Sequence, residues 1–203
     1  MHYILLDEIQ LAEGFEAMIN SLLRNENLDI YVTGSNSRFL SSDVITEFRG
    51  RGDEVNVRPL SFSEFLSVYD GDKSDALVGY MDYGGLPALV KLRTDEQKVS
   101  YLANMMETVC LKDIIGRNRI GLPYLLEDVV DILSSTACSL VNTTKIKDAM
   151  LSHGYESASE DTIARYIGFL EDAYLFEKAE RYDIKGRRYI GALEKYYPVD
   201  HGI

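Results

Sequence analysis

The stretch Tyr3-Ile4-Leu5-Leu6-Asp7-Glu8 decides the fold class of this chain. Four consecutive apolar residues are typical of a short strand that is buried on both faces, as the strands of parallel sheets are. Two adjacent carboxylates follow at the end of this strand. Because open α/β sheets bind their ligands at the carboxyl ends of the strands, the two acids form a candidate site. A strand that merely happens to end in two acids is the alternative interpretation.

Outward from this strand, the residues up to about residue 60 alternate between helical and strand patterns. Apolar residues at helical spacing between residues 15 and 23 predict an amphipathic helix. Residues 28–32 and 55–57 are predicted strands, with a further helix between residues 39 and 48. Alternating strands and helices imply parallel pairing in a doubly wound α/β sheet, with residues 28–32 beside residues 3–6.

The two acids fit the Walker B strand of a P-loop NTPase. In this interpretation Asp7 holds the Mg²⁺ that bridges the β- and γ-phosphates of ATP. Glu8 then orients or deprotonates the attacking water, as a positioned general base does.

Two later segments carry groups that such a site uses. The strand over residues 28–32 ends in Thr33-Gly34-Ser35-Asn36, where one hydroxyl or amide would hold the lytic water or the γ-phosphate. An ordinary helix N-cap is the alternative for this turn. Arg51 lies between two glycines and fits an arginine finger that neutralises charge in the transition state, although a solvated loop explains it equally well.

Residues 61–120 are predicted to be entirely helical. Ser61 and Glu64 form a capping-box pattern that begins a helix. The segment Tyr83-Gly84-Gly85-Leu86-Pro87 is a turn, because glycine pairs and proline interrupt helices. Apolar residues near helical spacing predict one long helix from Thr94 to about Ile115.

Residues 121–203 contain three predicted helices, at about 124–137, 143–152 and 160–173, of which the third begins at a capping-box pattern of Ser157 and Glu160. A hairpin over about 175–199 follows. Three helices followed by a hairpin is the order of a winged helix.

The winged-helix pattern suggests DNA contacts by one helix and by the tip of the wing. The candidate residues are Thr162, Arg165, Lys185, Arg187 and Arg188. Residues 121–203 nevertheless carry 9 basic and 14 acidic side chains, a net charge of −5. Because duplex binding depends on several phosphate contacts, this charge favours the alternative that the module packs against protein.

The whole chain of 203 residues has a net charge of −12, and none of its three parts is basic. The electrostatic pattern of a nucleic-acid binder is therefore absent. No apolar run approaches the ~20 residues that span a bilayer, so no membrane partner is expected. Two distant cysteines fit a reducing cytoplasm, and the three scattered histidines have no metal-ligand spacing.

Together these segments resemble a family of bacterial and archaeal AAA+ ATPases whose members carry a C-terminal domain of unknown function with a winged helix and a nuclease-like fold. The matching pieces, in order, are LLDEIQ (5–10), VTGSNS (32–37), GRGDEVNVRPLSFSEF (50–65), YGGLP (83–87), LKDII (111–115), LEDAYL (170–175) and KYYPVDHG (195–202). The resemblance covers essentially the whole chain. It implies that Asp7 and Glu8 are the Walker B pair, that Ser35 or Asn36 is the sensor, and that Arg51 is the arginine finger.

The sequence departs from the family pattern in two ways, which determine what part of the family protein we expect it to represent. Family members carry a GxxxxGK[ST] loop upstream of the acidic strand, and they continue past the DHGI segment into a nuclease-like domain; neither is found in this sequence. We therefore expect an internal fragment with three parts: the rear of the ATPase core (1–60), a helical lid region (61–120) and a winged-helix domain (121–203).

The resemblance implies that the full-length protein uses Mg²⁺ and ATP, whereas this chain alone binds neither and hydrolyses nothing. In the family the strand before the phosphate loop is normally central in the sheet, and that strand is expected to be missing here. Its loss would leave an exposed sheet edge, so homo-oligomerisation or closure of the sheet by residues 55–57 is expected. The alternative from a different class is a non-enzymatic winged-helix module that binds DNA or protein.

Overall fold

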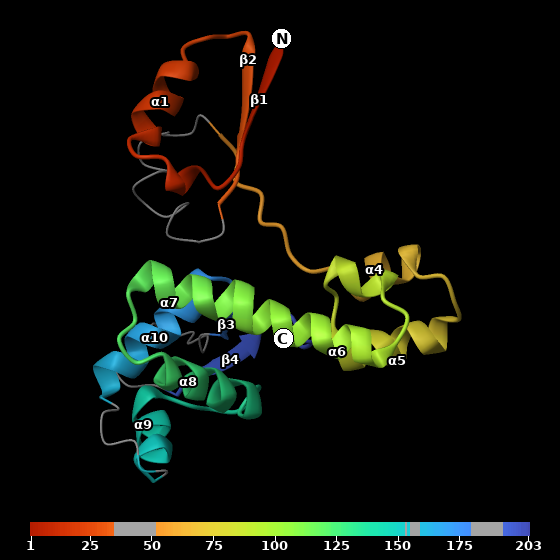
Figure 1. Cartoon of the computed structure of the whole chain (residues 1–203), viewed down its shortest axis with the longest axis vertical. Helices are drawn as coiled ribbons and strands as arrows, with labels where there is room; N and C mark the ends of the chain where they lie inside the picture. The colour runs from red at the N-terminus through yellow and green to blue at the C-terminus, as the bar shows by residue number, and fades with distance from the viewer. Residues whose placement is uncertain (35–51, 153, 155–158, 180–192) are drawn as a thin grey trace, which may run out of the picture. The chain divides into compact units, whose positions relative to one another are not determined.

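The chain divides into two compact units, Met1–Val57 and Arg58–Ile203, and each has a hydrophobic core of its own. The computed structural model describes residues 1–34, 52–152, 154, 159–179 and 193–203 (Figure 1). The predicted helix at 39–48 lies outside the described residues, as do the candidate site residues Ser35, Asn36 and Arg51.

The first unit is a strand–helix–strand arrangement. Its described elements are β1 (His2–Leu6), the 3₁₀ turn η1 (Ile9–Leu11), α1 (Phe15–Leu22) and β2 (Leu28–Val32). β1 and β2 pair in parallel, with His2 opposite Leu28 and Leu6 opposite Val32, which confirms the predicted pairing. The intervening helix supplies the crossover that a parallel pair requires.

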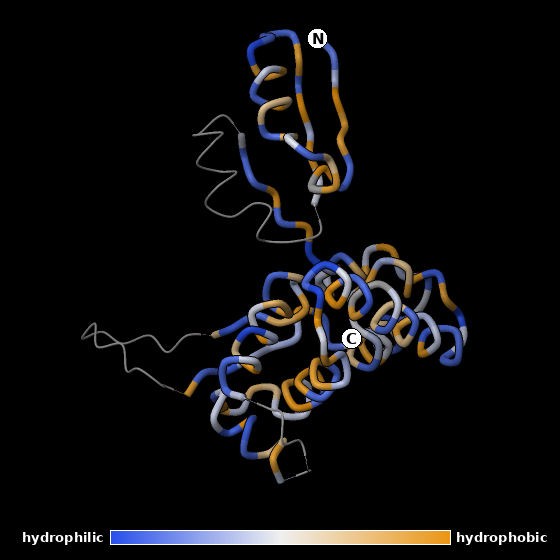
Figure 2. The backbone as a smooth tube through the Cα atoms, turned by 60° about the vertical axis from the view of Figure 1, so that its left-hand side comes forward, coloured by the Kyte–Doolittle hydropathy of each residue, from blue (hydrophilic) through white to orange (hydrophobic). Residues whose placement is uncertain are grey.

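Only one face of this strand pair is covered by the described elements of the unit. Ile9, Phe15 and Ile19 are buried against that face. On the opposite face Tyr3 and Leu5 are exposed, Leu5 by 77%. The prediction that the first strand is buried on both faces is therefore wrong for the described residues. Figure 2 shows the apolar residues that run along both strands in orange.

The predicted strand at Val55–Val57 is also wrong. These residues are extended but pair with no described strand, and Val57 is 92% exposed. A strand forms only where a partner offers its backbone groups, and the short Val-Asn-Val run with Pro59 close behind has too little apolar surface to secure one. Among the described residues the sheets are two separate strand pairs, so the doubly wound sheet is not seen.

The second unit begins with two short helices and a 3₁₀ turn, α4 (Phe62–Val68), α5 (Lys73–Tyr83) and η2 (Pro87–Lys91). The predicted capping box is confirmed at α4. The Glu64 amide donates to Ser61 Oγ at 3.4 Å, and the Ser61 amide donates to Glu64 Oε2 at 2.9 Å. α5 ends at Gly84, whose φ of 83° is in the region that favours glycine.

A long continuous helix follows, as predicted, but it contains a π-helical segment. α6 (Asp95–Asn104) passes into the π-helix η3 (Met105–Leu111) and then into α7 (Lys112–Asn118). Thr94 and Gln97 form a second capping box at its beginning. The part of the chain from residue 61 to residue 120 is helical wherever it has regular structure.

The remainder forms three helices and an antiparallel strand pair. The helices are α8 (Pro123–Ser135), α9 (Thr143–Ser152) and α10 (Glu160–Asp172), close to the predicted ranges. β3 (Phe176–Ala179) then pairs with β4 (Lys195–Pro198). The prediction of a capping box at α10 fails, because Ser159 is the N-cap and Glu160 turns to other partners; Ser157 lies outside the described residues.

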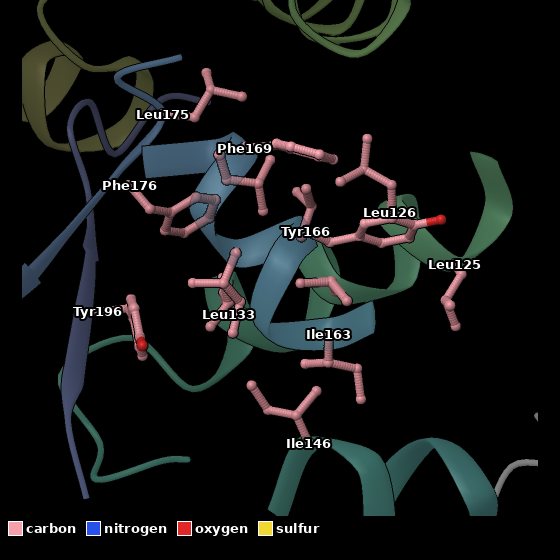
Figure 3. Packing of buried hydrophobic residues seen from close by; sticks show 14 of the residues in the cluster. Leu125, Leu126, Leu133, Ile146, Ile163, Tyr166, Phe169, Leu175, Phe176 and Tyr196 are labelled. Carbon is pink, nitrogen blue, oxygen red and sulfur yellow. The ribbon is translucent and has the colours of Figure 1, made fainter. Parts of the chain in front are cut away.

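These elements enclose the main core of the second unit. In Figure 3 side chains from α8 and α10 point towards one another, with Phe176 and Tyr196 from the two strands at one side. The largest fully buried side chains are Leu125, Leu126, Val129, Leu133, Ile146, Met150, Ile163 and Leu170. The helical periodicity of α8 and α10 therefore specifies one shared apolar interior.

Candidate functional site

The carboxyl ends of β1 and β2 bring Asp7 and Thr33 together. Leu6 is opposite Val32 in the parallel register, so the next residue on each strand lies at the same edge of the sheet. Thr33 Oγ1 donates a hydrogen bond to Asp7 Oδ1. This edge is where open α/β sheets bind their ligands.

Thr33 also fixes the backbone that carries the second carboxylate. Its hydroxyl accepts a hydrogen bond from the Glu8 amide at 3.2 Å. Its own amide donates to the Leu6 carbonyl at 2.9 Å, and its carbonyl accepts from the Ile9 amide at 3.2 Å. The residue directly after β2 therefore holds the whole turn at the end of β1.

Glu8 has a left-handed backbone, with φ 48° and ψ 45°. For a residue with a Cβ this conformation costs about 1–2 kcal/mol. The hydrogen bonds from Thr33 offset that cost, and the adjacent Ile9 is buried in the core of the first unit. A strained residue that its surroundings hold in place is a feature of functional sites.

The chemistry of this edge fits a hard cation that keeps other ligands. Asp7 is exposed, and Glu8 is partly buried. Among the described residues no three His, Cys, Asp or Glu side chains gather as a metal-binding group. Mg²⁺ needs no such group, because it usually takes one or two carboxylates and completes its shell with water and phosphate oxygens. Asp7, with Thr33 to orient it, fits that requirement.

Sequence reasoning includes Thr33 in the segment 33–36 but does not single it out. The resemblance instead favours Ser35 or Asn36, which lie outside the described residues together with Arg51. The signal was nevertheless present. Two five-residue strands that pair in parallel with their ends level place the first residue after each strand side by side.

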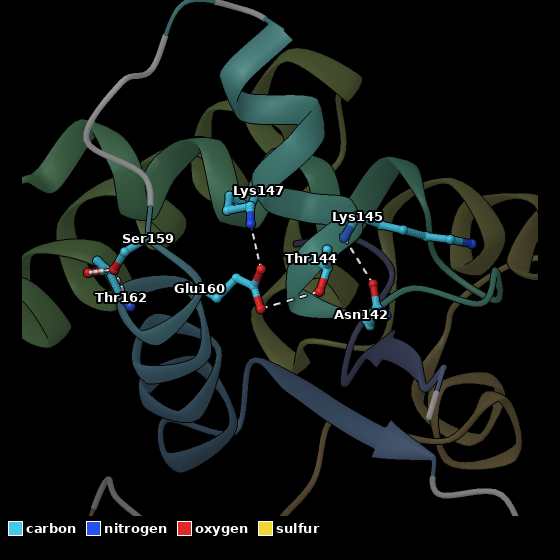
Figure 4. Close-up of polar contacts among 7 residues, drawn as sticks. All are labelled: Asn142, Thr144, Lys145, Lys147, Ser159, Glu160 and Thr162. Carbon is cyan, nitrogen blue, oxygen red and sulfur yellow. Dashed lines mark hydrogen bonds and ion pairs between the residues drawn. The ribbon is translucent and has the colours of Figure 1, made fainter. Parts of the chain in front are cut away.

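The candidate DNA-contacting residues of α10 make contacts within their own helix and its N-terminal cap. Thr162 closes the N-terminus of α10: its amide donates to Ser159 Oγ at 3.1 Å, and the two hydroxyls are 2.9 Å apart (Figure 4). Arg165 is exposed, and its guanidinium carbon lies 5.9 Å from the centre of the Tyr166 ring. The wing residues Lys185, Arg187 and Arg188 lie outside the described residues.

The two lysines of α9 also have partners within the protein. Lys147 pairs with Glu160 at 2.5 Å, and the same carboxylate accepts a hydrogen bond from Thr144 at 3.3 Å (Figure 4). This pairing raises the pKa of Lys147 and lowers the pKa of Glu160. Lys145 donates to the carbonyl of Leu140 at 3.3 Å. Helices α9 and α10 together carry three basic and five acidic side chains, an unfavourable surface for a phosphate backbone.

Two family models match successive parts of the chain. Residues 1–66 match the model of an AAA domain. Residues 74–203, more than half of the chain, match the model of a domain of unknown function (DUF8612), and the chain belongs to that family. None of the described helices has the length and apolar character needed to cross a membrane.

Relatives occur in a bacterium and an archaeon. An uncharacterized protein of Haemophilus influenzae is 36% identical over 206 residues, which cover 99% of this chain and 51% of that protein. An uncharacterized protein of Methanocaldococcus jannaschii is 23% identical over 209 residues, which cover 97% of this chain and 46% of that protein. The chain spans about half the length of these relatives.

Proposed function

We propose that this chain contributes the Walker B part of the nucleotide site of an AAA+ ATPase. The observation that carries the proposal is the hydrogen bond from Thr33 to Asp7 at the carboxyl ends of two parallel strands. The match of residues 1–66 to an AAA domain supports it independently.

Each side chain then has a distinct task. Asp7 would hold Mg²⁺, which supplies charge stabilisation on the phosphates of ATP. Glu8 orients the attacking water and accepts its proton, as a general base near the γ-phosphate does. Thr33 keeps the Asp7 carboxylate and the Glu8 backbone in place. The sequence holds no GxxxxGK[ST] loop to grip phosphates, so full activity belongs to a longer protein that supplies that loop.

The first test uses a full-length protein that contains this chain. We expect Glu8→Gln to lower kcat for Mg-ATP hydrolysis about 100-fold, since a general base contributes roughly that much, while ATP binding is retained. Glu13→Gln is the matched control, because Glu13 is an exposed acid of the same unit. Unchanged hydrolysis in Glu8→Gln would exclude the proposed role of this residue.

The isolated chain gives a second readout of the same proposal. Without a phosphate loop its affinity for Mg-ATP should be weak, in the millimolar range or beyond, by isothermal titration calorimetry. Tight binding by residues 1–203 would contradict the account, because it would require a phosphate grip that the sequence does not contain.

The second candidate function concerns the three helices and strand pair after residue 121, which follow winged-helix order. We propose that this module contacts protein rather than duplex DNA. The supporting observation is that Thr162 is bound in a helix cap and Lys147 is paired with Glu160.

A low-salt filter-binding assay tests this second proposal. We expect no salt-dependent duplex binding, and no change on Arg165→Glu or on the double substitution of Arg187 and Arg188 by Glu. Binding that weakens with salt and is lost in these variants would establish a DNA-binding wing.

A further inference from the structure

Two segments that are 115 residues apart meet at a buried carboxylate. Asp200, which follows β4, is 4% exposed. Its Oδ2 accepts a hydrogen bond from the Gly85 amide at 2.7 Å, and its Oδ1 accepts one from the Gly202 amide at 2.8 Å. The residues that follow α5 are therefore joined to residues 200–202 through the side chain of Asp200.

The neighbouring residues extend this joint. His201 Nε2 lies 2.5 Å from the Tyr80 carbonyl near the end of α5, and the two rings pack edge to face at 5.4 Å. The Tyr80 hydroxyl donates to the Leu60 carbonyl at 2.9 Å. We call this group the clasp; its members are Tyr80, Gly84, Gly85, Asp200, His201 and Gly202.

Glycine is required in the clasp because the two segments of the chain approach each other too closely for any side chain. A Cβ on Gly84 would overlap the Asp200 carboxylate, and a Cβ on Gly202 would overlap the Tyr83 carbonyl. The clasp therefore has a fixed shape that depends on backbone atoms, and it is held by hydrogen bonds together with the one ring contact between Tyr80 and His201.

The clasp connects two bodies with separate apolar interiors. The helical lobe (residues 58–91, comprising α4, α5 and η2) has Phe65, Ala76 and Leu89 as its buried hydrophobic residues, and none of them belongs to the core cluster of α7–α10 and β3–β4. The latter elements form the C-terminal lobe. Tyr196 and Ile203 pack in or against its core, so Asp200 belongs to this second body. In Figure 1 the C-terminus lies between the group of α4 and α5 and the group of α7 to α10.

We propose that the clasp is a releasable joint: the helical lobe parts from the C-terminal lobe when the bonds of Asp200 break together with the other polar contacts between the lobes, the Arg58–Glu177 ion pair and the His201–Tyr80 contact, while each lobe keeps its own core. Water can replace the bonds of a carboxylate at little net cost, whereas opening an apolar core carries a large one. Polar contacts between bodies of one chain permit relative motion. The inference concerns residues 58–203 alone and stands or falls apart from the nucleotide chemistry.

Native-state hydrogen exchange of the unmodified chain, followed by NMR, gives the first test. The Gly85 and Gly202 amides should exchange through a local opening whose rate hardly depends on low urea, whereas amides of α8 and α10 should require the urea-dependent unfolding of their core. An identical urea dependence for both sets would overturn the proposal, because the clasp would then open only with the whole unit.

Variants give the second test. In Asp200→Asn and Gly84→Ala, the Gly85 and Gly202 amides should exchange at least about tenfold faster, while amides of α8 and α10 keep their wild-type rates. Asp82→Asn is the control, because Asp82 is an exposed acid on α5. An unchanged exchange rate of the Gly85 amide in these variants would refute the proposal that the joint opens by itself. An equal increase in the exchange rates of the α8 and α10 amides would refute it as well.

Discussion

Thr33 shows how a small polar residue at the end of a strand can organise a site without being one of its acids. Its hydroxyl is shared between the Asp7 carboxylate and the Glu8 amide, so the orientation of one acid and the backbone of the other depend on the same oxygen. A methyl group in its place would leave Asp7 without this donor and Glu8 without this acceptor. The positions of both carboxylates are thus set from the neighbouring strand.

Substitution of Thr33 separates this positioning role from simple packing. In the full-length protein we expect Thr33→Val to lower kcat about tenfold and to raise the Mg²⁺ concentration needed for half-maximal activity, since one charge-assisted hydrogen bond is lost. Thr33→Ser keeps the hydroxyl and should retain most of the activity. Equal activity and Mg²⁺ dependence in all three proteins would show that the bond has no catalytic consequence.

At the scale of elements, α4 depends on its capping box. The Ser61 hydroxyl and amide both bind the Glu64 carboxylate, which lowers the pKa of Glu64. Because this pKa is lower in the folded than in the unfolded chain, the carboxylate stabilises the fold above the ordinary value for Glu. That contribution is lost as the pH falls through the lowered pKa.

The prediction for this element is a pH-dependent effect of Ser61→Ala. At pH 7 the substitution should destabilise the helix by about 1 kcal/mol. The difference from the unsubstituted protein should shrink as the pH falls through the lowered pKa of Glu64, because the carboxylate then becomes protonated. Urea denaturation monitored at several pH values measures it, with the exposed Ser63→Ala as control. A difference that does not vary with pH would argue against the contribution of Glu64.

Helices and strands with strong local patterns were predicted well from the sequence. The ranges of α8, α9 and α10 follow from apolar periodicity, because each of these helices buries one face in a single core. The strand at 55–57 failed because pairing depends on a neighbour and cannot be determined from a local pattern. The role of Thr33 could be recognised only from the register in which the two strands pair. The clasp required a contact across 115 residues, and its YGGLP and DHG segments carried no visible sign that they meet.

At the scale of the whole molecule, the two units differ greatly in how much core they contain. Among the residues that the structure describes, the first unit buries three apolar residues against a two-stranded sheet, whereas the second buries an extensive cluster. Two paired strands with so small a core are only marginally stable in water. We therefore expect the first unit to unfold at lower denaturant concentration than the second.

Two separate unfolding transitions should appear in urea. Leu133→Ala, which removes a fully buried side chain of α8, should lower only the second transition, by about 2–5 kcal/mol. Leu151→Ala should change it by less than about 0.5 kcal/mol, because Leu151 is 44% exposed. A single transition that moves as a whole would show that the units fold together.

The clasp also has a consequence for synthesis on the ribosome. Gly85 is made 115 residues before Asp200, the side chain that its amide binds in the finished protein. At about 5–20 residues per second this separation lasts roughly 6–23 s. Throughout that interval the helical lobe emerges and folds without its closing contact. Asp200 therefore completes a structure that was begun 115 residues earlier, and a nascent chain that stops short of Asp200 leaves the helical lobe without this contact.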